Sequence, residues 1–164
     1  MPLTLEEKRE IRTLFLGDDY SKVAKWFKLF EDPVFRPKFN MTWEEIREKP
    51  MLNLKKISQS GLVSVKDFFG NPKNIFLAHE MIAFIDSSTV TKFTVQYNLF
   101  GGSITALHTD RHNYLFDKID SFEVFGCFCL TELGFGNNAV KMETTVTYDE
   151  AKKEFVVNSP TVLS

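Results

Sequence analysis

The fold is decided by a change of periodicity in residues 121–158, which read SFEVFGCFCL TELGFGNNAV KMETTVTYDE AKKEFVVN. Within the expected strand 139–149, every second residue from Val140 to Tyr148 is apolar or a threonine, and the residues that alternate with them, Lys141 to Asp149, are polar or charged. This two-residue period is typical of a half-buried strand. We expect that strand to pair in antiparallel fashion with residues 153–158.

The residues before this hairpin predict one further strand and a loop. Residues 123–130 are rich in Val, Phe, Cys and Leu, which favours a strand. Residues 131–138 contain Gly134 and Gly136 and predict a loop. Two hairpinned strands and one stub do not make an independent sheet. We therefore expect the strands to need partners, either from residues beyond Ser164 or from another chain.

Upstream of residue 121 the apolar residues follow the 3.6-residue period of helices. Two capping boxes, Thr4 with Glu7 and Thr42 with Glu45, mark helix starts. The pattern predicts helices over 4–16, 20–31, 42–60, 74–86 and 89–100, the third interrupted or kinked at Pro50.

Individual residues predict where these helices begin and end, and which of their faces are apolar. We expect Asp18 or Asp19 to cap the second helix and Ser87 or Ser88 to cap the fifth. A break at Gly101-Gly102 and a short helix capped by Asp110 should follow. Apolar residues at helical spacing, and the Phe-rich helices generally, are read as core. The residues of the first two stripes are Ile11, Leu14, Phe15, Val23, Trp26, Phe27 and Phe30.

The predicted fold class is α+β. An all-α N-terminal domain, residues 1–120, is followed in residues 121–164 by the first strands of an antiparallel β-domain that is incomplete in this chain. The N-terminus carries no recognisable secretory or transit signal, and the C-terminus is no peroxisomal Ser-Lys-Leu signal.

Composition excludes some partners. Twenty basic and 22 acidic side chains give a net charge of −2, which provides no field for nucleic acid or an anionic membrane. No apolar run approaches the length that spans a bilayer. Cys127 and Cys129 are two residues apart on one strand face and do not easily form a disulfide, which favours a reduced compartment.

Histidines and cysteines are weak metal candidates. His108 and His112 have the four-residue spacing of zinc sites, but no third ligand is evident. The two cysteines lack a second pair. His79, alone in an apolar helix, is interpreted as a hydrogen-bonded core histidine. We therefore predict no metal site.

The loop at 131–138 is the strongest candidate for chemistry. Its glycines would let the backbone approach a ligand closely, and exposed N–H groups could hold an anion or a polar ring edge. Thr131 adds a hydroxyl and Asn137 an amide. From the residues alone, a wide turn without a ligand is the more common reading of such a loop.

Three motifs at these spacings change that reading: TELGFG at 131–136, ETTVTYD at 143–149 and EFVVNSP at 154–160. Together with Gly126-Cys127-Phe128-Cys129-Leu130 they resemble the flavin-binding signature of the acyl-CoA oxidase and dehydrogenase family, most of all its oxidase branch. The resemblance is strong from about residue 98 onward and weaker, with a consistent helix order, before it.

The resemblance implies FAD as cofactor and a fatty acyl-CoA as substrate. Family members form the trans-2-enoyl-CoA, and the oxidases pass the electrons to O2, giving H2O2. The implied flavin-binding residues are Phe128, Cys129, Leu130, Thr131, Gly134 and Gly136, and the implied substrate contact is Asn137. The resemblance also implies a peroxisomal protein, with a mitochondrial one as alternative, and a homo-oligomer when full length.

Two departures separate this chain from the family pattern. Phe135 stands where the family often has His, and Asn137 stands where it usually has a small hydroxyl residue. The catalytic carboxylate of the family lies beyond Ser164, so no residue of this chain is assigned as the base. An acyl-CoA dehydrogenase of the same family, and a short non-catalytic relative with a structural or interaction role, stay open as alternatives.

Overall fold

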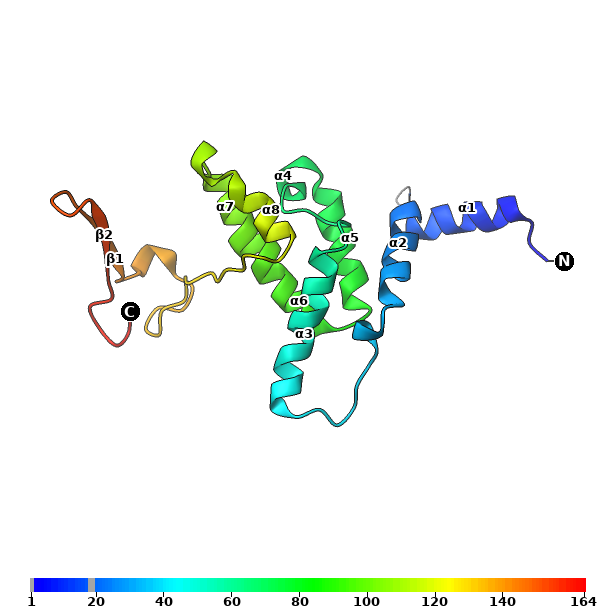
Figure 1. Cartoon of the computed structure of the whole chain (residues 1–164), viewed down its shortest axis with the longest axis horizontal. Coiled ribbons are helices and arrows are strands. Elements are labelled where there is room, and N and C mark those ends of the chain that lie inside the picture. Colours follow the sequence, from blue (N-terminus) through cyan, green and yellow to red (C-terminus); the bar gives the residue numbers. More distant parts are fainter. Residues whose placement is uncertain (1, 18–19) are drawn as a thin grey trace. The chain divides into compact units, whose positions relative to one another are not determined.

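The computed structural model of the chain describes residues 2–17 and 20–164 (Figure 1). It consists of two compact units, one running to Cys127 and the other from Phe128 to Ser164. The first unit is helical and the second contains a two-stranded antiparallel sheet, so the predicted α+β class is confirmed.

The helices of the first unit lie close to their predicted ranges. They are joined by short 3-10 segments at Pro33–Phe35 and Asp110–His112, and by a π-helix at Thr94–Gly101. The α-helices are α1 (Leu5–Leu16), α2 (Tyr20–Phe30), α3 (Trp43–Ser58), α4 (Asp67–Gly70), α5 (Pro72–Ala83), α6 (Ser87–Phe93), α7 (Gly102–Leu107) and α8 (Tyr114–Asp120).

Both predicted capping boxes are confirmed. Thr4 donates its N–H to the Glu7 carboxylate at 2.7 Å, and Glu7 donates its own N–H to the Thr4 hydroxyl at 3.2 Å. Thr42 and Glu45 repeat the arrangement at 3.0 and 3.3 Å. The expected cap of α2, Asp18 or Asp19, lies outside the described residues.

The predicted cap of α6 is wrong, because Asp86 takes that role. Its carboxylate accepts the N–H groups of Ser88 and Thr89 at 3.2 and 2.9 Å, and the Thr89 hydroxyl at 2.6 Å. Ser87 and Ser88 are therefore inside the helix. A carboxylate with two acceptor oxygens satisfies several donors of the first turn at once, which one hydroxyl cannot do.

Two further predictions about helix ends are wrong. Gly101-Gly102 does not break the chain's helical course, because the π-helix continues directly into α7. Asp110 is the first residue of a 3-10 segment whose N-cap is Thr109, and Asn113 precedes α8. Glycine weakens a helix without forbidding it. Gly101 is needed here because a Cβ there would lie 2.5 Å from Val65 Cγ2.

The core of the helical unit is formed mainly by α3, α5, α6 and the π-helix. α6 packs against α3 and α5. Phe93 stacks on Tyr97 with ring centroids 4.6 Å apart, and both side chains are fully buried. The other fully or nearly fully buried apolar residues include Trp26, Leu54, Ile57, Val65, Ala78, Ile82 and Ile119.

The prediction that the aromatic-rich helices bury their apolar stripes is only partly right. Trp26 and Val23 of α2 are buried, but Phe27 is 54% exposed. None of the described side chains of α1 is buried, and Leu14 and Phe15 are about four-fifths exposed at 81% and 80%. Periodicity indicates which face is apolar but does not say whether this chain supplies a partner for it.

The second unit contains the predicted hairpin, shortened at its start. β1 (Thr145–Asp149) pairs with β2 (Glu154–Asn158), with Thr147 opposite Val156 at the centre of the register. The antiparallel pairing is confirmed. Residues 139–144 are not strand, however, and a 3-10 segment occupies Ala139–Lys141.

The predicted strand at 123–130 is wrong, since these residues adopt no regular structure. A strand exists only where a neighbouring strand takes its backbone groups. Here the Val124 carbonyl and the Gly126 N–H are bound by the side chain of Gln96, and the Val124 N–H is bound by the Lys118 carbonyl. Within residues 2–17 and 20–164, no helix is long and apolar enough to cross a membrane.

The cap of α6 gives a direct stability test. We expect Asp86→Ala to lower the free energy of unfolding by about 0.5–2 kcal/mol, because the first turn loses its acceptors. Ser87→Ala, the matched control at the residue first expected to cap, should change it by less than about 0.5 kcal/mol. Thermal unfolding followed by circular dichroism distinguishes them, and equal losses in both variants would contradict the assignment.

Candidate functional site

Residues 131–138 form the predicted loop, and the loop closes on itself. Glu132 and Gly136 exchange two backbone hydrogen bonds, from Glu132 N to Gly136 O at 3.1 Å and back at 2.8 Å. Gly136 has a φ of 58°, a region that side-chain-bearing residues rarely adopt. The glycine at 136 is therefore required by the turn itself.

Gly134 is required for a different reason, a close approach to another part of the same unit. Its N–H donates to the Leu163 carbonyl at 2.8 Å. A Cβ at this position would lie 2.8 Å from the Leu163 Cβ, closer than carbon atoms tolerate. The loop is thus held against the segment near residue 163.

Glu132 holds the loop against the residues before β1, a role that sequence reasoning missed. Its side chain is 5% exposed, and its two carboxylate oxygens accept the N–H groups of Glu143 and Thr144, both at 2.9 Å. These two backbone bonds hold the pKa of the Glu132 carboxyl below its usual value. The signal available in the sequence was that Glu132 is the only charged residue of the loop at 131–138.

The same bonds explain why β1 begins at Thr145. The N–H groups of Glu143 and Thr144 are directed to the Glu132 side chain and are not available to a strand ladder. Thr161 adds a second contact by donating its hydroxyl to Glu143 at 2.7 Å.

The structure brings two predicted site residues together, Thr131 and Asn137. The Thr131 hydroxyl donates to the Asn137 side-chain oxygen at 2.5 Å, and both residues are exposed. Among the described residues, no group donates to the Thr131 oxygen and none accepts from the Asn137 amide nitrogen. This pair offers one acceptor and one donor to a polar ligand.

The other predicted site residues present backbone groups. Phe128 and Cys129 are exposed, and Leu130 is half-buried. Among the described residues, none accepts a hydrogen bond from the backbone N–H of Phe128, Leu130 or Thr131. A backbone amide without a protein partner needs water or a ligand. Residues 128–131 are therefore equipped to bind the polar edge of a ring.

The remaining candidates serve structural roles. His79 makes hydrogen bonds to the Ile75 carbonyl at 2.8 Å and to the Thr94 hydroxyl at 3.1 Å, which confirms the interpretation of a satisfied histidine. His108 contacts the Thr105 carbonyl at 2.7 Å. In the part of the chain that the structure describes, no three His, Cys, Asp or Glu residues are grouped to hold a metal. Cys127 and Cys129 form no disulfide.

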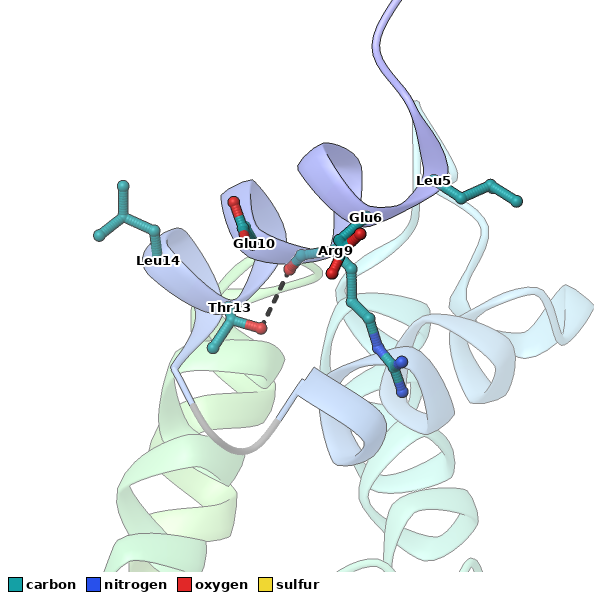
Figure 2. Close-up of a pocket in the computed structure, with 6 residues that line it drawn as sticks. All are labelled: Leu5, Glu6, Arg9, Glu10, Thr13 and Leu14. Atoms are coloured by element: carbon teal, nitrogen blue, oxygen red, sulfur yellow. Dashed lines mark hydrogen bonds between the residues drawn. The ribbon is translucent and has the colours of Figure 1, made fainter.

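A hollow on the surface of the helical unit does not form a site. It measures about 890 Å³ and is lined by Leu5, Glu6, Arg9, Glu10, Thr13 and Leu14. Figure 2 shows that all six residues project from the single helix α1, with Thr13 donating its hydroxyl to the Arg9 carbonyl at 3.0 Å. A hollow with one wall does not enclose a small molecule.

Comparison with known proteins gives a consistent result. No family model matches the chain. The human peroxisomal acyl-coenzyme A oxidase 3 is 34% identical over 134 residues, which cover 80% of this chain and 19% of the relative. The acyl-coenzyme A oxidase acox-3 of Caenorhabditis elegans is 35% identical over 136 residues, 82% of this chain and 20% of its own length.

Solved structures agree with the sequence matches. The crystal structure of acyl-CoA oxidase 1 from Yarrowia lipolytica superposes with a TM-score of 0.72 at 26% identity, covering 90% of this chain and 22% of that one. Sequence and structure together establish a family relationship between this chain and the acyl-CoA oxidases. The chain spans about a fifth of the length of the curated relatives just named.

The buried carboxylate of Glu132 predicts a pH-dependent loop. Because folding lowers the pKa of Glu132 below its ordinary 4.5, the bonds to Glu143 and Thr144 are fully present above that pH and weaken as pH falls through the lower folded pKa. We expect the Glu143 and Thr144 amides to lose protection from hydrogen exchange in that range, after correction for intrinsic rates. Glu132→Gln should remove most of this pH dependence.

Glu150→Gln is the matched control, because Glu150 is exposed in the hairpin turn. It should leave the exchange of both amides unchanged. Protection of Glu143 and Thr144 that is the same in the wild-type chain and in Glu132→Gln at every pH would contradict the role of Glu132.

Proposed function

We propose that the complete protein containing this chain is an FAD-dependent acyl-CoA oxidase. Residues 1–120 would form its N-terminal helical domain, and residues 121–164 the start of its flavin-binding β-domain. The observation that carries the proposal is the loop at 128–137. The backbone N–H groups of Phe128, Leu130 and Thr131, which no described residue accepts, and the Thr131–Asn137 pair occur in a chain related to acyl-CoA oxidases.

The residues of the loop are compatible with a flavin. Its ring edge carries hydrogen-bond donors and acceptors, which the N–H groups of Phe128, Leu130 and Thr131 and the Thr131 oxygen can match. Gly136 has nothing within 4 Å of the place where a Cβ would stand, so backbone and ligand can approach there. Gly134 holds the loop through its contact with Leu163.

When bound, FAD would supply the acceptor for the hydride that leaves the Cβ of a fatty acyl-CoA. This chain would contribute the flavin contacts of Phe128, Cys129, Leu130, Thr131, Gly134 and Gly136, and Asn137 would face the substrate. Glu132 is unsuited to act as the base, because both of its oxygens already accept backbone N–H groups. The carboxylate base would be provided from outside residues 1–164.

The relatives support the oxidase over the dehydrogenase. Several similar proteins from animals, plants and yeasts are named acyl-coenzyme A oxidases, and the human and Arabidopsis thaliana ones are named peroxisomal. We infer O2 as the electron acceptor, H2O2 as the product, a peroxisomal location and a homo-oligomeric complete protein. Peroxide release by the complete protein on addition of an acyl-CoA separates the oxidase from the dehydrogenase.

A second candidate is a short, non-catalytic relative with an interaction role. It is favoured by the departures at Phe135 and Asn137, and by the apolar residues that the hairpin leaves exposed, among them Val146, Phe155 and Val157 at 61%, 69% and 66%. The reading frame after Ser164 discriminates the two. Continued coding for flavin-binding strands supports the enzyme, and a stop codon supports the interaction role.

The hydroxyl of Thr131 provides a test of flavin binding in the complete protein. We expect Thr131→Val to weaken FAD retention by about 0.5–1.5 kcal/mol, because one hydrogen bond to the ring is lost. Thr147→Val is the matched control, since Thr147 is exposed on β1, away from the loop. FAD affinity measured by fluorescence titration that is equal in both variants would count against the assignment.

The isolated chain of residues 1–164 should neither bind FAD tightly nor turn over an acyl-CoA. Its sheet has two strands with exposed residues on both faces, and it lacks an assigned base, whose proton transfer commonly contributes about 10²–10⁴ in rate. We expect a helical circular-dichroism spectrum, a colourless preparation and no peroxide. A yellow preparation that releases peroxide would refute this.

A further inference from the structure

Gln96 is a buried polar side chain with two partners in a distant part of the helical unit. It is 3% exposed and belongs to the π-helix Thr94–Gly101. Its Nε2 donates to the Val124 carbonyl at 2.9 Å, and its Oε1 accepts the Gly126 N–H at 3.3 Å. One carboxamide therefore binds the backbone on both sides of Phe125, as a neighbouring strand would.

Phe100 of the same π-helix makes a second contact with residues 124–126. Its ring lies so close to Gly126 that a Cβ there would be 2.2 Å from the Phe100 Cδ2. Gly126 has no unusual φ, so its need for glycine is steric. Gln96 binds the polar groups of this segment, and Phe100 packs against its backbone.

The segment that Gln96 and Phe100 contact, residues 124–126, lies at the end of the helical unit. Residues 124–126 are the last part of the helical unit before Cys127, and Phe128 begins the second unit. No strand holds them, as the structure of residues 121–130 shows. The two bonds from Gln96 and the bond from the Val124 N–H to the Lys118 carbonyl at 3.0 Å hold the backbone of this stretch, together with the ring contacts of Phe100 at Gly126 and of Phe122 at Phe125.

We propose that Gln96 is a positioning residue for the flavin site. By binding residues 124 and 126 it holds the last part of the helical unit, which directly precedes the flavin-facing residues 128–131 in the sequence. The inference rests on the proposed function. π-Helical turns occur often at functional sites. Here the π-helix carries Gln96, whose side chain binds the backbone of Val124 and Gly126.

The bond itself can be measured in the chain of residues 1–164. Gln96→Leu replaces the carboxamide with an apolar group of similar size. Hydrogen exchange of the Gly126 amide should then become about tenfold faster or more, because the amide has lost its acceptor. Amides of α5 should exchange as before. Gln59→Leu is the matched control, because Gln59 is exposed at the end of α3.

The functional consequence is measured as FAD affinity of the complete protein. Gln96→Leu should weaken FAD binding by roughly tenfold, and Gln96→Glu, which keeps the acceptor for Gly126 but loses the donor to Val124, should lie between it and the wild type. Gly126→Ala should also weaken binding through the clash with Phe100, and Phe100→Ala should rescue it in the double variant. Gly70→Ala is the matched control, with open space around its Cβ.

The possible outcomes separate the two claims. If the unchanged complete protein binds no FAD, the proposed function fails and the flavin role of Gln96 fails with it. If the unchanged protein binds FAD and Gln96→Leu binds it equally well, only the positioning inference is overturned. A uniform loss of protection in α5 and at Gly126 would also overturn it, because Gln96 would then serve general stability.

Discussion

The structure depends on one constraint: backbone N–H and carbonyl groups that leave solvent must find partners, and here a complete sheet does not provide them. Side chains supply these partners instead. Gln96 binds the backbone at Val124 and Gly126, and Glu132 binds the backbone at Glu143 and Thr144. Each unit therefore holds an irregular stretch of backbone with a side chain, at Val124 and Gly126 in the first unit and at Glu143 and Thr144 in the second.

The helices were largely predictable because local signals determine them. The capping boxes at Thr4 and Thr42 set two helix starts to the residue. The wrong predictions concern features that depend on a second residue, either a neighbour that competes for the same role or a residue far away in the sequence. Asp86 competes with Ser87 for the first turn of α6, and the exposure of Phe15 depends on the absence of a covering partner among the described residues, which periodicity cannot reveal.

The sequence indicated where the candidate loop lies but not which contacts hold it. The spacing of Thr131, Gly134 and Gly136 indicated a loop able to approach a ligand. It could not indicate that Gly134 packs on Leu163 or that Glu132 is buried, because those contacts join segments 11 to 29 residues apart in sequence (from 132–143 to 134–163). The proposal that this loop contacts a flavin rests on the relationship to acyl-CoA oxidases, and the contacts of Gly134 and Glu132 explain how the loop keeps its shape.

A crystal structure of the complete protein grown with FAD tests the account most directly. We expect backbone atoms of residues 128–131 and the Thr131 hydroxyl to lie within hydrogen-bonding distance of the isoalloxazine ring, about 2.7–3.2 Å. The Gln96 contacts to Val124 and Gly126 should persist in that structure. An isoalloxazine ring bound away from this loop, or a loop whose amides are all taken by protein partners, would contradict it.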